Sequence, residues 1–359
     1  MNFVFMFNAV TLGSGYVNRN YNLAKKMRQK GENAWFFTFI KRREFDIPIE
    51  SVGIPARLVD APVLKHYLSF RTTRQLKRLN PKYLHVDFTP IDEYAYHASR
   101  KLKASVVYSY HGVADPTLYE GKARKIRIKQ LERIHKNIRN ADLRISVSKY
   151  MQRELEEQGI DSHVVYNGID PEFFRPDVAE TVDKKILFLS RLEPHKGVHF
   201  IIDAFKRIKR EIPDATLDIA GSGANKEYYE QLLQKSKDVE GIHFLGKVPD
   251  ILLPKLYASA SLFVLPTLWE GFGMPFMEAQ ACGTPCVGFD LCSIPEVVQH
   301  GKTGLLVPPK DIDALSEACI EILSSKKKQE TLSKNAYRWS RKFTWDKITD
   351  RFISLVQQV

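Results

Sequence analysis

Short apolar runs alternate with helix-length segments along the whole chain, and this alternation restricts the fold more than any other feature. Strands that alternate with helices in this way are typical of βα units that build a parallel sheet. The sequence therefore predicts an α/β fold of two Rossmann-like doubly wound domains, with ligands at the carboxyl ends of the strands. The expected strands are 3–7, 34–40, 83–88, 105–112, 142–148 and 162–168, and then, after the aperiodic stretch 169–184, 185–190, 215–221, 242–246, 261–266, 285–290 and 303–309.

Other features narrow the class of protein. No run of about 18 apolar residues occurs, and the N-terminus lacks the pattern of a signal peptide, so we expect a cytoplasmic protein.

The four cysteines, Cys282, Cys286, Cys292 and Cys319, form no CxxC pair and no zinc-type spacing with histidine. They are expected to be buried thiols in a reducing compartment.

The net charge of +12 is unevenly distributed, because residues 1–180 carry +10 and the remainder only +2. A one-sided basic surface suggests an anionic partner for the first half, such as nucleic acid, acidic lipid or an acidic substrate. The densest cluster lies in 122–140, where apolar residues near helical spacing predict an amphipathic helix. Either that helix packs on a core with a solvated charged side, or it contacts anionic lipid headgroups. No RNA-binding consensus is present, so no nucleic-acid partner is expected.

The stretch WEGFGMPFMEAQACGTPC, residues 269–286, places two acids around a glycine-rich turn. Pro275 suits the first turn of a helix, so Gly271, Phe272, Gly273 and Met274 are expected at its N-terminus, where backbone N–H groups can hold phosphate. Glu270 precedes the helix and Glu278 lies within it. Both acids can bind hydroxyl groups, which a nucleotide sugar would offer. The alternative interpretation is that the two acids only stabilise the N-terminus of the helix through its dipole.

Two cations, Arg191 and Lys196, follow the strand expected at 185–190. At the carboxyl end of a strand they form a natural clamp for a diphosphate. The N-terminal Gly13-Ser14-Gly15, between a strand and a helix, fits either a phosphate-approaching loop or a plain tight turn, because Asn18 leaves the dinucleotide fingerprint incomplete.

Together these segments resemble the retaining glycosyltransferases of family 4, which have the GT-B fold of two Rossmann-like domains facing across a cleft. The matching segments are VVYNGIDPEFFRP, SRLEPHKGVHFIIDAF, LDIAGSGANKEYYEQLL, the run from IHFLGKVPD through the E-x7-E segment to GTPCVG, and SIPEVVQHGKTGLLVPPKD, with looser matches at LHVDF, YHGV and ADLRISVSKYMQREL. The resemblance implies an acceptor-binding domain at 1–170, a linker at 171–184 and a donor-binding domain at 185–340. A C-terminal helix at 341–359 would pack back on the first domain.

The resemblance also implies roles for single residues. Arg191 and Lys196 would hold the donor diphosphate, Glu278 the ribose hydroxyls and Glu270 the transferred sugar. Backbone N–H groups of Phe272, Gly273 and Met274 would assist Glu270. The further implied contacts are Gly246, Lys247 and Val248 beside the base, Gly15 near the phosphates and His111 facing the sugar.

The expected function is transfer of a sugar from a nucleotide diphosphate sugar to a glycan, lipid or small-molecule acceptor, with retention of anomeric configuration. No DxD motif occurs, so neither a metal nor another cofactor is expected, and the enzyme is expected in the cytoplasm or peripherally on the inner face of the membrane. Loss of Arg191 or Lys196 should harm catalysis far more than folding. The alternatives are another GT-B enzyme, such as a nucleotide-sugar epimerase or a phosphorylase, and a non-catalytic sugar-nucleotide binding module.

Overall fold

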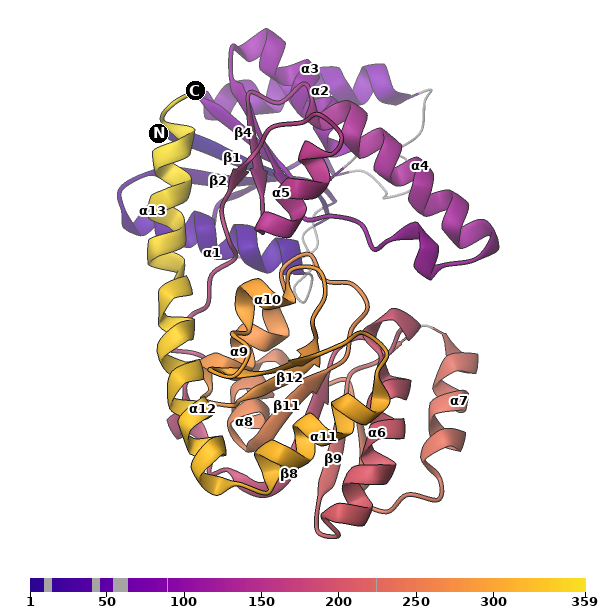
Figure 1. Ribbon diagram of the computed structural model, residues 1–359. Coiled ribbons are helices and arrows are strands. Elements are labelled where there is room, and N and C mark those ends of the chain that lie inside the picture. The colour runs from indigo at the N-terminus through magenta and orange to yellow at the C-terminus, as the bar shows by residue number, and fades with distance from the viewer. Residues whose placement is uncertain (10–14, 41–45, 54–63, 89, 224) are drawn as a thin grey trace. The chain divides into compact units, whose positions relative to one another are not determined.

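The computed structural model describes residues 1–9, 15–40, 46–53, 64–88, 90–223 and 225–359. They form two compact units (Figure 1). The first unit combines Met1–Gly168 with Trp345–Val359, and the second is Ile169–Thr344. The expected Gly13 and Ser14 lie outside the described residues, whereas Gly15 begins a helix.

The first unit contains a parallel sheet with the strand order β3-β2-β1-β4-β5-β6-β7 in the described residues. The chain therefore runs outward in one direction from β1 and then in the other direction from β4, as in a doubly wound sheet. Its elements are β1 (Asn2–Ala9), α1 (Gly15–Gln29), β2 (Asn33–Ile40), β3 (Ile49–Ser51), α2 (Lys65–Leu79), β4 (Tyr83–Val86), α3 (Ile91–Leu102), β5 (Ser105–Tyr110), α4 (Gly121–Ile138), β6 (Leu143–Ser146), α5 (Lys149–Glu156), β7 (His163–Val164) and α13 (Trp345–Val356).

The last helix of the chain, α13, completes the core of the first unit and lies beside α1 (Figure 1). Phe352 is fully buried, with its ring centroid 5.4 Å from that of Phe3 on β1. On the outer side of this contact, Lys26 and Lys30 of α1 form ion pairs with Asp346 and Asp350. Apolar burial rather than these exposed pairs supplies most of the stabilisation.

The second unit contains a parallel sheet with the order β10-β9-β8-β11-β12-β13 in the described residues. Its central strands β11 and β12 are buried along their whole length, as expected where helices cover both faces of a parallel sheet. Its elements are β8 (Val182–Leu189), α6 (Val198–Glu211), β9 (Thr216–Ala220), α7 (Lys226–Ser236), β10 (Ile242–Gly246), α8 (Leu253–Ala258), β11 (Ala260–Leu265), α9 (Met274–Ala281), β12 (Cys286–Phe289), α10 (Ile294–Val297), β13 (Gly304–Val307), α11 (Ile312–Leu323) and α12 (Lys326–Ser340).

The predicted pair of doubly wound α/β domains is confirmed by these two strand orders. Strand β8 starts at Val182, inside the stretch that the sequence suggests as a linker. The cysteines are free thiols, and all but the half-buried Cys292 are buried. Among the described residues, no helix is both long and apolar enough to cross a membrane.

The basic helix α4 differs from the expected amphipathic packing. Only Ile134, Asn137 and Ile138 near its end are buried. Ile126, one of the apolar residues at helical spacing in 122–140, is 54% exposed, and Ile128 is exposed as well. The first half of α4 therefore presents both cations and apolar side chains to solvent.

Candidate active site

Most of the sequence-predicted donor residues of the second unit follow the two strands between which its strand order reverses, β8 and β11. In a doubly wound sheet the loops leave these two neighbouring strands in opposite directions, which opens a crevice at their carboxyl ends. Arg191 and Lys196 follow β8, and Glu270 follows β11. The loops after β8, β9 and β10 are joined by backbone hydrogen bonds, including Leu192 N to Ser222 O and Gly221 N to Gly246 O.

Gly197 fixes the position of Lys196. It has φ +77°, and a Cβ added there would lie 1.9 Å from the carbonyl oxygen of Pro266. Only glycine allows the chain to pass so close to the end of β11. A backbone hydrogen bond of 2.7 Å from Leu268 N to His195 O joins the same two loops. The side chain of Lys196 is thereby directed at the loop that carries Glu270.

Lys196 and Glu270 form a buried ion pair, with Nζ 2.5 Å from Oε1. Their side chains are 9% and 11% exposed. The hydroxyl of buried Ser293 donates to the carbonyl oxygen of Glu270 at 2.9 Å, which holds the backbone of that loop. The structure thus joins a predicted diphosphate ligand and a predicted sugar ligand directly to each other.

Arg191 is placed differently, because its side chain is 67% exposed and Nη1 lies 2.6 Å from Oε1 of Glu193. Such an exposed ion pair contributes little to stability, so this cation is available to an incoming anion.

Helix α9 begins beside Glu270. Gly273 adopts φ +94° directly before Met274, the first helical residue, and Pro275 occupies the first turn. No side chain caps this helix start, and Phe276 N–H bonds back to the carbonyl of Gly273 at 3.1 Å. Gly271 and Phe272 are buried, with Phe272 only 3% exposed. An uncapped helix start carries partial positive charge that favours an anion.

Glu278 lies one turn into α9, where its partly buried carboxylate accepts a hydrogen bond of 2.9 Å from the hydroxyl of Tyr257. Loss of solvation raises the pKa of Glu278 to about 7, against the lowering effect of the Tyr257 hydroxyl. One carboxylate oxygen is thus fixed by Tyr257, and the other is left for a ligand. Gly246, Lys247 and Val248 lie farther along the same sheet edge, at the end of β10, where Lys247 is exposed.

In the first unit, His111 directly follows β5 and is partly buried. Its Nε2 lies 2.8 Å from Oδ1 of Asp87, which follows the neighbouring strand β4. Gly15 begins α1, at the carboxyl edge of the same sheet.

The sequence reasoning missed several supporting residues. Tyr257 and Ser293 are far from the acids in sequence, and no local pattern marks them. Asp87 and Arg19 were also missed as functional residues, although Asp87 stands at a strand end in LHVDF. A polar side chain directly after an apolar run is the signal that could have identified it.

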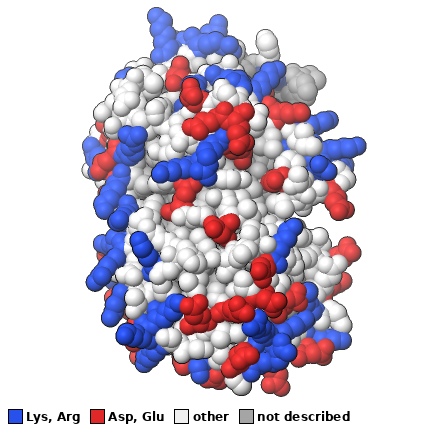
Figure 2. Space-filling model, viewed as in Figure 1, with Lys and Arg blue, Asp and Glu red and all other residues white. Residues whose placement is uncertain are grey.

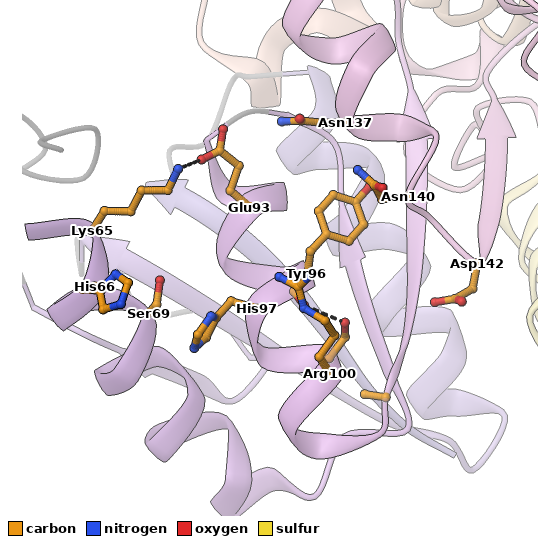
Figure 3. Close-up of a pocket in the computed structure, with 12 residues that line it drawn as sticks. Lys65, His66, Ser69, Glu93, Tyr96, His97, Arg100, Asn137, Asn140 and Asp142 are labelled. Carbon is orange, nitrogen blue, oxygen red and sulfur yellow. Dashed lines mark hydrogen bonds and ion pairs between the residues drawn. The ribbon is translucent and has the colours of Figure 1, made fainter.

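The first unit also contains a pocket of about 650 Å³ (Figure 3). It is lined by side chains of α2, α3 and the end of α4, together with Ala104 and Asp142 just before β5 and β6. It therefore reaches the amino ends of the strands, opposite the edge that carries His111. Among the described residues, no group of three or more His, Cys, Asp or Glu side chains is arranged to hold a metal ion.

Comparison with known protein families identifies the family to which the chain belongs. The family model described as Glycosyl transferases group 1 matches residues 170–339, and the model described as Glycosyltransferase Family 4 matches residues 13–173. The chain belongs to the group 1 and family 4 glycosyltransferases. The resemblance to the family 4 glycosyltransferases is therefore confirmed, while retention of configuration stays a prediction.

Individual members of these glycosyltransferases are similar over part of their length. O-antigen chain mannosyltransferase B of Escherichia coli is 33% identical over 170 residues, covering 47% of this chain and 44% of the relative. A GDP-mannose-dependent alpha-(1-6)-phosphatidylinositol monomannoside mannosyltransferase of Mycobacterium tuberculosis is 28% identical over 208 residues, covering 53% and 54%. The chain thus spans about half the length of the curated relatives it matches.

Among solved structures, Anabaena HepE in complex with UDP and glucose aligns over 100% of both chains, with a TM-score of 0.80 and 20% identity. At this identity the likeness establishes the fold. Together with the two strand orders, it assigns this glycosyltransferase to the GT-B class of two Rossmann-like domains.

The buried ion pair changes what we expect from loss of Lys196. In a Lys196→Met variant the carboxylate of Glu270 would stay buried without its partner, so the free energy of unfolding should fall by about 3–5 kcal/mol. Lys196→Met/Glu270→Gln should regain most of this stability but no activity. Urea denaturation of the three proteins measures the effect, with Arg191→Ala as an exposed control that leaves stability nearly unchanged. A double variant no more stable than Lys196→Met would contradict the conclusion that the unpaired Glu270 carboxylate causes the loss of stability.

The raised pKa of Glu278 predicts a pH-dependent stability difference. Because the folded pKa of about 7 exceeds the ordinary value of 4.5, ionisation of this carboxyl opposes folding, and its contribution to the free energy of unfolding should decline between about pH 4.5 and 7. Glu278→Gln keeps an acceptor for Tyr257 but cannot ionise. The free energy of unfolding of the variant should therefore increase relative to that of the wild type as pH rises, by up to about 3 kcal/mol at pH 8. Thermal unfolding from pH 5 to 8 measures this, with exposed Glu230→Gln as control; a difference independent of pH would refute it.

Proposed function

We propose that this protein is a retaining, metal-independent glycosyltransferase that moves a sugar from a nucleoside diphosphate sugar to an acceptor hydroxyl. One observation carries the proposal: the segments that follow β8 and β11, at the switch point of the second unit, hold Arg191, the Lys196–Glu270 pair and the uncapped start of α9. Family membership supports the same reaction class, and HepE, the structural neighbour, is bound to UDP and glucose.

The ion pair suggests how the donor is received. When a diphosphate enters, Lys196 exchanges the carboxylate of Glu270 for phosphate oxygens, and the released carboxylate accepts hydrogen bonds from sugar hydroxyls. The buried charges are then compensated both before and after binding, which avoids the cost of an unpaired buried ion. Donor binding thereby sets the orientation of Glu270 toward the sugar.

Departure of the nucleoside diphosphate places negative charge on its phosphate oxygens. Arg191, Lys196 and the first N–H groups of α9 would stabilise that charge as it develops. Three such positive groups can serve where other transferases use a divalent cation, so no metal is required in this proposal. Glu278 would accept hydrogen bonds from the ribose hydroxyls through the oxygen that Tyr257 leaves available.

A transfer assay tests the proposal directly. Thermal-shift screening with UDP, GDP and ADP sugars first identifies the donor, because a ligand that binds only the folded state raises its stability. With that donor, we expect a new glycoside of unchanged anomeric configuration only when an acceptor is added, and activity within a few-fold after EDTA treatment. Arg191→Ala should lower kcat by roughly 10²–10³-fold without loss of stability, whereas Lys247→Ala should affect donor binding more than kcat.

Several results would count against it. Change of the donor sugar without acceptor would indicate an epimerase, and dependence on inorganic phosphate a phosphorylase. Donor binding without any turnover would indicate a binding module. Loss of activity in EDTA with rescue by Mg²⁺ or Mn²⁺ would refute metal independence.

We further propose that α4 brings the enzyme to an anionic membrane surface. The first half of this helix exposes Ile126 and Ile128 among lysines and arginines, and Figure 2 shows such basic side chains projecting along it. Apolar insertion together with attraction to acidic headgroups is the combination that holds interfacial helices. One relative is named for a phosphatidylinositol-based acceptor, which supports an acceptor embedded in a membrane.

Vesicle co-sedimentation tests this surface. Wild-type protein should bind anionic vesicles at low salt and dissociate at high salt, because each basic residue contributes on the order of 1 kcal/mol and salt screens it. Lys122→Gln/Lys125→Gln/Lys129→Gln should abolish binding, whereas Lys326→Gln/Lys327→Gln/Lys334→Gln, which removes the same charge from α12, should not. Equal recovery with neutral and anionic vesicles would leave a soluble glycan or small molecule as the better acceptor.

A further inference from the structure

A buried polar network surrounds Asp87 at the switch point of the first unit, between β1 and β4. The carboxylate is 2% exposed, and its two oxygens have different partners. Oδ1 lies 2.8 Å from Nε2 of His111, and Oδ2 accepts a hydrogen bond of 2.5 Å from Nδ2 of Asn20 on α1. Asp87 therefore connects the start of α1 to the residue that follows β5.

Arg19 and His85 join this network through Ser109. Arg19 is 1% exposed, and its Nη1 donates to the hydroxyl oxygen of Ser109 at 3.2 Å. The same hydroxyl shares a hydrogen bond of 2.8 Å with Nε2 of His85. Burial lowers the pKa of His85 to about 4, so this ring is neutral, and its Nδ1 lies 3.8 Å from Oδ2 of Asp87.

Asp87 is thus surrounded by donors and remains ionised. Burial alone would raise the pKa of its carboxyl, but His85, His111 and Arg19 outweigh that effect, and the pKa lies below its ordinary value. Arg19 acts mainly through its charge, because its Nε and Nη2 have no hydrogen-bond partner among the described residues. An ionised carboxylate can only accept hydrogen bonds, so Nε2 of His111 must carry a hydrogen.

Phe88 holds the ring of His111 from a second direction. The two rings are stacked, with centroids 5.9 Å apart and planes 18° apart. The plane of the imidazole is therefore fixed by Phe88, and its rotation within that plane by Asp87. The other ring nitrogen, Nδ1, makes no hydrogen bond to the described part of the chain.

We propose that Asp87 is a positioning residue for sugar transfer: it holds His111 as the Nε2–H tautomer, which leaves Nδ1 to accept a hydrogen bond from a substrate hydroxyl. The inference rests on the proposed transferase function and on contact between His111 and substrate. Asn20 and Arg19 serve the same end, since one fixes the second oxygen of Asp87 and the other balances its charge.

Nitrogen NMR of histidine-labelled enzyme tests the tautomer without any turnover. The His111 signals, identified by their absence in His111→Gln, should show a protonated Nε2 and an unprotonated Nδ1 in the wild type. In Asp87→Asn the side-chain amide can present a donor to Nε2, so that preference should be lost. Asp161→Asn, an exposed carboxyl in the same unit, should keep the wild-type pattern.

Kinetics then test the link to catalysis. Asp87→Asn should lower kcat about 10–100-fold, the usual effect of removing a group that orients a functional histidine, while the donor KM stays unchanged. His111→Gln should lower kcat by a similar factor. The double variant Asp87→Asn/His111→Gln should lower kcat no further than either single variant, because the two residues act as one unit.

Each contrary outcome has a distinct meaning. A wild-type spectrum with hydrogen on Nδ1 overturns the proposal even if Asp87→Asn fails to fold, and losses that multiply in the double variant overturn it as well. A wild type with the expected tautomer but no transferase activity would refute the proposed function. The Asp87 contact would then be a structural feature of the fold, not a positioning device.

Discussion

The reversal of strand order in each parallel sheet is the constraint on which the candidate sites depend. Where two neighbouring strands send their connections to opposite faces, the backbone leaves room for polar side chains that a closely packed sheet would not admit. In the second unit this position lies between β8 and β11, and in the first between β1 and β4. Both units place buried charged side chains there, although the charges differ.

The two units compensate the free-energy cost of burying those charges in different ways. In the second unit, Lys196 and Glu270 neutralise each other directly, so each can be released only if a ligand supplies a replacement. In the first unit, Asp87 is compensated by neutral donors and by the nearby charge of Arg19, without a direct ion pair between the two. The first arrangement is suited to exchange of partners on binding, and the second to holding a side chain still.

The sequence predicted the layers of the fold well, because alternating apolar runs determine a parallel α/β sheet almost independently of detail. It also predicted that Arg191, Lys196 and Glu270 follow strand ends, which the structure confirms, because a strand end can be read from the point where an apolar run stops. Their roles toward a donor remain predictions. It could not predict that Lys196 pairs with Glu270, since the contact joins positions 74 apart and depends on the close passage at Gly197. The raised pKa of Glu278 could not be predicted from the sequence either, because loss of solvation depends on the residues packed around the carboxyl and not on a motif.

Packing and site chemistry meet in the last helix of the chain. Phe352 of α13 packs on Phe3 of β1 and also on the ring of His85, at centroid distances of 5.4 and 5.8 Å. The side chain that α13 helps to bury is therefore His85, which shares a hydrogen bond with the Ser109 hydroxyl and faces Asp87. Exclusion of water by this aromatic contact keeps His85 uncharged. A charged His85 would be drawn to Oδ2 of Asp87, the oxygen that Asn20 holds. A purely apolar contact made by α13 therefore supports the polar geometry at the strand ends.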